Sequence, residues 1–159
     1  MAKTTPATLA LGKAGIKFEL ATYDYDPGAD HIGIAAAEAL GVPPAIVLKT
    51  LMAEVDGKPV CVVVPSDREV SMKKLAAAFG GKAAQMLKPD SAERLTGFKV
   101  GGISPFGQRK RVPTVVEATA LALETAFING GQRGLQVRLR PADALAALGG
   151  KAADVVAEK

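Results

Sequence analysis

The chain has 159 residues, of which 48% are hydrophobic, and a formal net charge of +4. This length fits a single domain, and the composition excludes an intrinsically disordered protein. No apolar run reaches the roughly 18 residues of a membrane-spanning helix, and the N-terminus lacks the apolar segment of a signal peptide, so we expect a soluble, cytoplasmic protein. With one cysteine and one histidine, a Cys/His zinc site is excluded; we expect neither metal nor cofactor.

The first third of the chain predicts two short helices with a strand between them. Thr5 caps a helix over residues 7–14 and is followed by a proline, which suits a first helical turn. Alternating apolar residues over 17–24 predict a strand. The alanine-rich segment 32–40 predicts a helix that ends at Gly41.

A β-hairpin is the clearest local signal in the middle of the chain. Asp56 and Gly57 join two apolar runs, 47–55 and 59–64, and this dipeptide favours a two-residue turn. Further on, the pattern predicts helices at 71–79, 90–97 and 141–148 and strands at 83–87, 112–118, 125–129 and 135–139. Because helices and hairpins are interspersed, we expect one domain over residues 1–159, of the α/β class in its α+β form, with a mixed central sheet flanked by helices.

Lys49 stands out because it interrupts a run that is apolar on both faces of the strand expected at 47–55. Such strands are normally covered on both sides. An ammonium group there must find a partner, reach a water-filled pocket or lose its proton. One interpretation is a lysine whose stem packs on the sheet while its head reaches solvent. The other places the ammonium at a pocket mouth, where it stabilises negative charge or binds phosphate.

A glycine-rich segment at 101–108 is the second candidate. It begins with Gly101 and Gly102, and adjacent glycines allow positive φ angles and leave backbone N–H groups uncovered. Such groups form anion-binding concavities or oxyanion holes, although a tight surface turn explains the same pattern. The segment matches neither the phosphate-loop nor the dinucleotide-binding pattern of glycines.

Other polar features have simpler explanations. The basic run 109–111 is interpreted first as a solvated loop and second as a phosphate-contacting patch together with Arg133. Tyr23 and Tyr25 end the first expected strand and can wall a pocket. Cys61, in an apolar run, is expected to be an inert core thiol, and His31 is expected to belong to a helix start.

Four segments together resemble the YbaK family of aminoacyl-tRNA editing proteins, and within it the free-standing deacylases that act on Cys-tRNA(Pro). The segments are 47–51, 96–108, 111–114 and 130–135. The likeness covers nearly the whole chain in order, and the glycine-serine-proline stretch combined with the upstream lysine is its specific part. It implies a mixed, barrel-like sheet flanked by helices, the fold of the editing domain inserted in bacterial prolyl-tRNA synthetases.

The resemblance also implies residue roles. Lys49 matches the family's essential lysine, which holds the terminal adenosine phosphate or the ester, and Gly101 matches the loop whose backbone faces the aminoacyl carbonyl. These two are the expected catalytic residues. The expected substrate-binding residues are Tyr23, Thr50, Gly102, Ile103, Ser104 and Gln136, and the expected tRNA-binding residues are Lys110, Arg111 and Arg133. Deacylases of the family often have an acidic residue where this chain has Gln136, so a carboxylate at this position is not essential here.

The activity implied by the resemblance is trans-editing of mischarged tRNA. A binding pocket separates similar small side chains by only about 1–3 kcal/mol, so prolyl-tRNA synthetase needs a second step that removes cysteine. The thiol of the attached cysteine attacks its own ester, and no protein nucleophile is needed; Cys61 is not expected to be one.

The expected partners are the acceptor end of aminoacyl-tRNA and prolyl-tRNA synthetase, with no DNA and no membrane, and the chain is expected to be a monomer. Cys-tRNA(Cys) is a further candidate substrate. Two alternatives stay open: a deacylase for another mischarged tRNA such as Ala-tRNA(Pro), and a non-catalytic module that binds tRNA or a synthetase.

Overall fold

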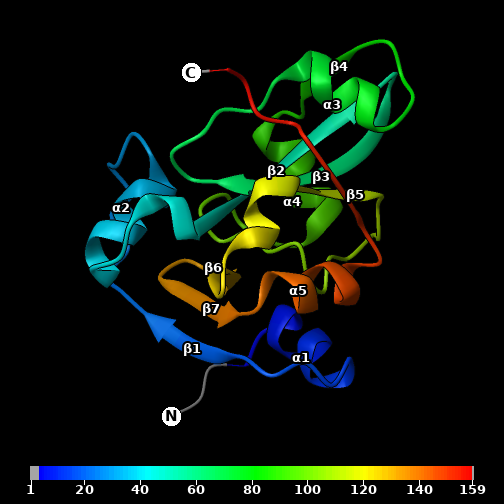
Figure 1. Ribbon diagram of the computed structural model, residues 1–159. Coiled ribbons are helices and arrows are strands. Elements are labelled where there is room, and N and C mark those ends of the chain that lie inside the picture. The colour runs from blue at the N-terminus through cyan, green and yellow to red at the C-terminus, as the bar shows by residue number, and fades with distance from the viewer. Residues whose placement is uncertain (1–3, 159) are drawn as a thin grey trace.

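The computed structural model describes residues 4–158 as a single α/β domain built on one mixed eight-stranded sheet (Figure 1). Residues 1–3, part of the N-terminus expected to lack a signal peptide, lie outside the described residues. The helices are α1 (Pro6–Lys13), α2 (Ile32–Leu40), α3 (Met72–Ala78), α4 (Pro89–Thr96) and α5 (Pro141–Leu148), with short 3-10 helices η1 (Pro44–Ile46) and η2 (Ala118–Ala122). The strands are β1 (Glu19–Thr22), β2 (Val47–Val55), β3 (Lys58–Pro65), β4 (Ala84–Met86), β5 (Thr114–Glu117), β6 (Ala126–Gln132), β7 (Leu135–Leu139) and β8 (Lys151–Ala153).

The strand order along the sheet is β1-β7-β6-β2-β3-β5-β8, and β4 pairs with β2 beside this path. Parallel pairs join β2 to β6, β3 to β5 and β5 to β8, whereas the other pairs are antiparallel. The mixed sheet flanked by helices, expected from the sequence, is therefore confirmed.

The β2–β3 hairpin forms the centre of the sheet. Asp56 and Gly57 adopt φ angles of 50° and 81°, as a two-residue turn with both central residues left-handed requires. The pairing runs without a break from Leu48 opposite Pro65 to Val55 opposite Lys58. These strands are apolar on both faces because both faces are covered, as expected for buried strands.

Three apolar clusters cover the sheet. Leu11 of α1 and Ala144 of α5 belong to the largest cluster, which packs on one face of the sheet; both helices lie in the lower part of Figure 1. Leu75 of α3 belongs to a second cluster with valines of β3. In the third cluster, Ala36 and Ala37 of α2 pack against β2 and β6.

The structure differs from the sequence-based expectations mainly at sheet edges. Strand β1 is shorter than the expected strand at 17–24, and β5 begins at Thr114, not at residue 112. Strand β8 was not expected, because its three residues have no alternating pattern and form a strand by pairing with β5. Strand β6 continues to Gln132 through a register shift after Asn129. Within the described residues, every helix is too short or too polar to cross a bilayer.

Candidate functional site

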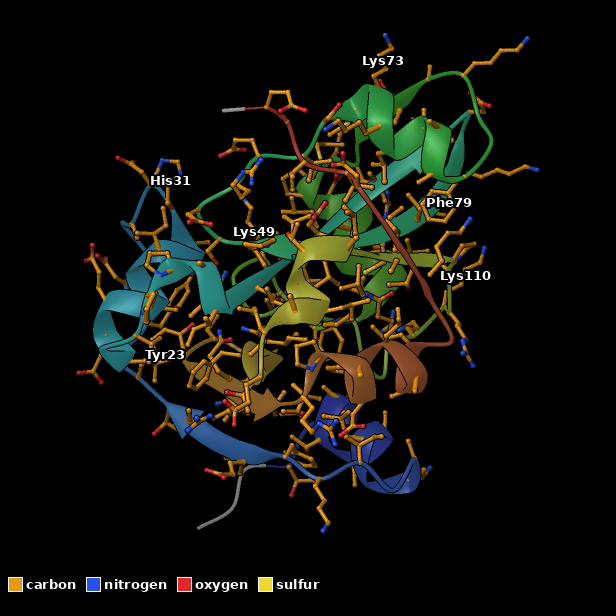
Figure 2. The ribbon with its side chains drawn as sticks, in the orientation of Figure 1. Tyr23, His31, Lys49, Lys73, Phe79 and Lys110 are labelled. Atoms are coloured by element: carbon orange, nitrogen blue, oxygen red, sulfur yellow. The ribbon has the colours of Figure 1, made fainter. Side chains whose placement is uncertain are left out.

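Lys49 lies on β2, between two of the apolar clusters that pack on the sheet. Its neighbours on that face are Val47, which packs in the α2 cluster, and Leu51, which packs against the α3 cluster. The side chain of Lys49 is only 20% exposed, and its Nζ lies 3.7 Å from Oε1 of Glu69. Figure 2 shows Lys49 near the centre of the molecule in that view. The ammonium group is therefore a partly enclosed charge with one carboxylate partner.

A cavity of about 520 Å³ opens beside Lys49 because the sheet divides there. Strand β2 pairs with β6 only at Val47 and Leu48, and its pairing with β4 begins at Ala53. Between these points the β2 edge borders the cavity instead of a neighbouring strand. Thr50 and Lys49 point to opposite faces of β2, and both line the cavity, which follows from this gap.

The start of α2 lines part of the cavity and carries the partial positive charge of the helix dipole. His31 precedes the helix without a side-chain hydrogen bond that caps it, and His31, Ile32 and Gly33 line the cavity. A Cβ atom added at Gly33 would lie 2.2 Å from Oγ of Ser66 and 3.8 Å from Cβ of Lys49. The helix start thus packs directly on β2 and on Ser66, the residue after β3. Its dipole adds to the Lys49 charge in favouring an anion.

The glycine segment contributes Gly101 and Ile103 to the lining of the same cavity. Gly101 has a φ angle of 90°, and an added Cβ would lie 2.3 Å from the Tyr25 hydroxyl oxygen. Its carbonyl oxygen accepts a hydrogen bond from Nδ2 of Asn129 at 3.3 Å. Gly102 does not line the cavity; its N–H donates to the Lys99 carbonyl at 2.8 Å.

Two other predicted substrate-binding residues line the cavity and have unsatisfied groups. Oγ1 of Thr50 and Oε1 of Gln136 are buried and have no hydrogen-bond partner among residues 4–158. Gln136 as a whole is only 4% exposed. A buried polar atom without a partner costs about 1–3 kcal/mol, so both atoms are suited to receive a ligand's hydrogen-bond donors.

Ser104 and Tyr23 lie away from the cavity wall. Ser104 is fully buried, and its Oγ accepts a hydrogen bond from the Phe106 N–H at 3.2 Å. Tyr23 packs in the α2 cluster, where its hydroxyl is buried without a partner among the described residues. The tyrosine beside the glycine segment is Tyr25.

Arg133 and Tyr25 hold the glycine segment from outside. The Arg133 guanidinium lies 5.2 Å from the centre of the Tyr25 ring, and its Nε donates to the Val100 carbonyl at 2.8 Å. Sequence reasoning named Tyr25 only as a pocket wall and missed its contact with Gly101. No pattern in the segment around Tyr25 indicates this contact, because it joins residues far apart in the chain.

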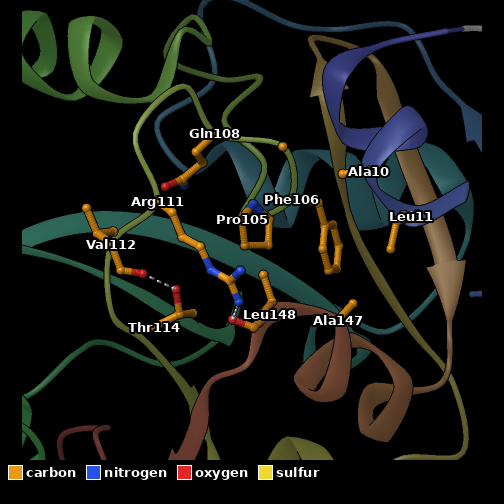
Figure 3. Close-up of a pocket in the computed structure, with 11 residues that line it drawn as sticks. Ala10, Leu11, Pro105, Phe106, Gln108, Arg111, Val112, Thr114, Ala147 and Leu148 are labelled. Atoms are coloured by element: carbon orange, nitrogen blue, oxygen red, sulfur yellow. Dashed lines mark hydrogen bonds between the residues drawn. The ribbon is translucent and has the colours of Figure 1, made fainter. Parts of the chain in front are cut away.

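The basic residues Lys110 and Arg111 lie apart from the cavity. Both are exposed, and Nη2 of Arg111 donates to the Leu148 carbonyl at 3.1 Å. Arg111 lines a second hollow of about 190 Å³ between α1, α5 and the segment after Pro105 (Figure 3). Among residues 4–158, none lines both hollows.

Cys61 is a buried residue of β3, opposite Met52 of β2 on one side and Thr114 of β5 on the other. Burial raises the pKa of its thiol to about 12, although hydrogen bonds involving Thr114 and Gln108 act in the opposite direction. The thiol is therefore neutral at physiological pH and closed to solvent. Within residues 4–158, no group of three or more His, Cys, Asp or Glu side chains is placed to hold a metal ion.

Comparison with known proteins identifies the family. The model of the family described as "Aminoacyl-tRNA editing domain" matches residues 26–147. The chain belongs to the aminoacyl-tRNA editing domain family. It is 34% identical over 140 residues to a protein of Enterococcus faecalis named "Putative Cys-tRNA(Pro)/Cys-tRNA(Cys) deacylase EbsC", and the match covers 86% of this chain and 85% of that one.

Other relatives of this editing-domain protein are larger. The proline–tRNA ligase of Nitratidesulfovibrio vulgaris is 35% identical over 107 residues, which cover 67% of this chain but only 18% of the ligase. Two solved structures share the fold at 22% identity: a "putative trans-editing enzyme for prolyl tRNA synthetase", with a TM-score of 0.81 over 99% of this chain and 100% of that one, and "hypothetical protein APE2540", with a TM-score of 0.85 over 96% and 100%.

Proposed function

We propose that this protein is a trans-acting aminoacyl-tRNA deacylase that removes cysteine from mischarged Cys-tRNA(Pro). The observation that carries the proposal is the shared cavity, because Lys49 and Gly101 both line it. The similarity to EbsC, which extends over most of both chains, supports the cysteine specificity. Cys-tRNA(Cys) is a second substrate under this proposal, as the name of EbsC suggests for that protein.

The proposed roles follow from the residues that line the cavity beside Lys49. Lys49 and the start of α2 bind the phosphate or ester oxygens of the terminal adenosine, because both are positive. Gly101 places its backbone against the aminoacyl carbonyl, and Ile103 bounds the same space. Thr50 and Gln136 accept hydrogen bonds from the substrate through their unsatisfied oxygens.

The remaining predicted residues act outside the cavity under this proposal. Gly102 and Ser104 keep the glycine segment in shape through the Lys99 and Phe106 contacts. Tyr23 supports α2 from within its cluster. The residues proposed to bind tRNA are Arg133, which lies beside the glycine segment, and Lys110 and Arg111, which lie on another part of the surface.

The proposed chemistry uses the substrate's own thiol. The thiol of the esterified cysteine loses its proton to water, the thiolate attacks the ester carbonyl, a carbon–sulfur bond forms and the carbon–oxygen ester bond breaks. The ribose oxygen leaves and takes up a proton from water, so no net proton is consumed. The products are a cysteine thiolactone and free tRNA. An intramolecular attack has a large advantage in effective concentration, up to roughly 7–11 kcal/mol, so the protein needs only to hold the reactive geometry and the developing oxyanion. The buried, neutral Cys61 takes no part.

The proposed setting is the cytoplasm, where a monomer acts on the acceptor end of tRNA released by prolyl-tRNA synthetase or held in a complex with it. The relation to proline–tRNA ligases supports this partner.

Deacylation of a panel of mischarged tRNAs tests the proposal. Cys-tRNA(Pro) should be cleared faster than Ser-tRNA(Pro) and Ala-tRNA(Pro), because serine is nearly isosteric with cysteine but has a far weaker nucleophile. Equal clearance of the serine and cysteine esters would disprove the thiol-assisted step. Preferential clearance of the alanine ester would assign another specificity, and tight tRNA binding without release of any amino acid would make the protein a binding module.

A further inference from the structure

The wall of the Lys49 cavity contains a carboxylate that the proposed function has not used. Four lining residues have ionisable side chains: Asp30, His31, Lys49 and Glu69. Of the two carboxylates, only Glu69 is in contact with Lys49, at 3.7 Å from Nζ. Gln136, which also lines the cavity, is neutral and contributes no charge.

The side chain of Glu69 is free for a ligand, whereas its backbone is held in place. The Glu69 carbonyl accepts a hydrogen bond from the Ala157 N–H at 2.8 Å, and the adjacent Val70 forms a bridge with Val156. The side chain itself is 77% exposed at the cavity mouth, and no hydrogen bond between described residues involves its carboxylate. An ion pair this exposed adds little to the stability of the fold. The backbone therefore fixes the point at the cavity from which the Glu69 side chain extends, and the fold does not depend on the carboxylate.

An aminoacyl ester brings a positive charge to this place. Its α-ammonium group is attached to the carbon next to the reacting carbonyl, so a carbonyl near Lys49 and Gly101 puts the ammonium at the same end of the cavity. A carboxylate accepts several hydrogen bonds through two oxygens. With Oε1 of Glu69 toward Lys49, Oε2 is left for a second cation.

We infer that the Glu69 carboxylate receives the α-ammonium group of the substrate and so restricts the site to esters with a free α-amino group, excluding N-acylated and peptidyl esters. This inference rests on the proposed deacylase function. Acylation of the amine would remove the charge and leave the carboxylate without its partner.

The test compares Cys-tRNA(Pro) with N-acetyl-Cys-tRNA(Pro) for wild type, Glu69→Gln, Asp30→Asn and Asp67→Asn. Asp67 is an exposed carboxylate two residues before Glu69 that does not line the cavity, so its variant is the matched control. We expect Glu69→Gln to lower kcat/KM for the free ester roughly 10- to 30-fold, the effect of one charged hydrogen bond, and to leave kcat/KM for the acetylated ester unchanged. The ratio between proteins cancels the different intrinsic reactivity of the two esters.

Three results would overturn the inference: equal losses on both esters, which would make Glu69 a positioning residue for Lys49; wild-type behaviour of Glu69→Gln; or the selective loss appearing in Asp30→Asn instead. In each of these cases wild-type clearance of the free ester still supports the deacylase function. Absence of wild-type clearance of any aminoacyl ester would refute that function as well.

Discussion

Replacing Lys49 by methionine isolates the charge of the central residue. Methionine keeps an unbranched apolar stem on β2, so the packing between the α2 and α3 clusters is retained and no large void forms. The lost ion pair joins a 20% exposed side chain to a 77% exposed one, and its contribution to stability is therefore below about 1 kcal/mol. For a chain of this length that corresponds to a change in Tm of at most about 4 °C.

The effect on catalysis should be much larger than the effect on stability. Through its proposed contact with the ester oxygens, Lys49 stabilises the negative charge that develops there, and removing one such group costs about 2.7–4 kcal/mol, or roughly 10²- to 10³-fold in rate. Single-turnover deacylation of Cys-tRNA(Pro) measures this loss, with Tm determined on the same samples. Lys58→Met is the matched control, because Lys58 is exposed at the start of β3 and does not line the cavity. A folded Lys49→Met protein with the wild-type rate would refute the assignment.

Three further predictions concern the backbone at Gly101, the thiol of Cys61 and the carboxylate of Glu117. Gly101→Ala should lower kcat/KM at least 10-fold, since the new methyl group would lie 2.3 Å from the Tyr25 hydroxyl oxygen at a φ of 90°. Cys61→Ala should keep the deacylation rate while costing about 1 kcal/mol of stability in the core. Burial raises the pKa of Glu117, but hydrogen bonds from the Val155 N–H and from Thr119 outweigh it, and the net pKa lies below the ordinary 4.5. The Glu117 carboxylate therefore stabilises the fold above pH 4.5, and this stability is lost as the pH falls through the folded pKa; urea unfolding should show a smaller loss between pH 7 and pH 3 for Glu117→Gln.

Each of these predictions has a control and an opposing result. Gly12→Ala is the control for Gly101, because an added Cβ there meets nothing within 4 Å; equal rates for the two alanine variants would contradict the packing argument. A loss of activity in Cys61→Ala at unchanged fold would give the thiol a chemical role. An identical pH dependence of unfolding for wild type and Glu117→Gln would show that this carboxylate is not responsible.

The elements that the sequence predicted well are those whose signals are local. The turn at Asp56 and Gly57 needs left-handed backbone at two successive residues, and few dipeptides allow this. The Ser71 side chain accepts a hydrogen bond from the Lys74 N–H, so the cap of α3 is fixed within one turn. Helix α5 begins at Pro141 and ends before the left-handed Gly149, again through local backbone preferences.

The site was predictable only in part, because the cavity is formed by long-range pairing. The unusual position of Lys49 was visible in its apolar surroundings. The gap between β4 and β6 along the edge of β2 could not be predicted, because it depends on the pairing of β2 with β6 ending at Leu48. The contacts of Asn129 with Gly101 and of Glu69 with Lys49 join residues 28 and 20 positions apart. No residue pattern within one element indicates such contacts.

Binding of a non-hydrolysable substrate analogue tests the central claim most directly. A cysteinyl-adenosine analogue with an amide in place of the ester can be titrated while the backbone amide resonances of the protein are followed by NMR. The account predicts the largest shifts at Thr50, Gly101, Ile103 and Gln136, in the walls around Lys49. Shifts confined to the hollow at Arg111 and Leu148, with the Lys49 cavity unchanged, would contradict it.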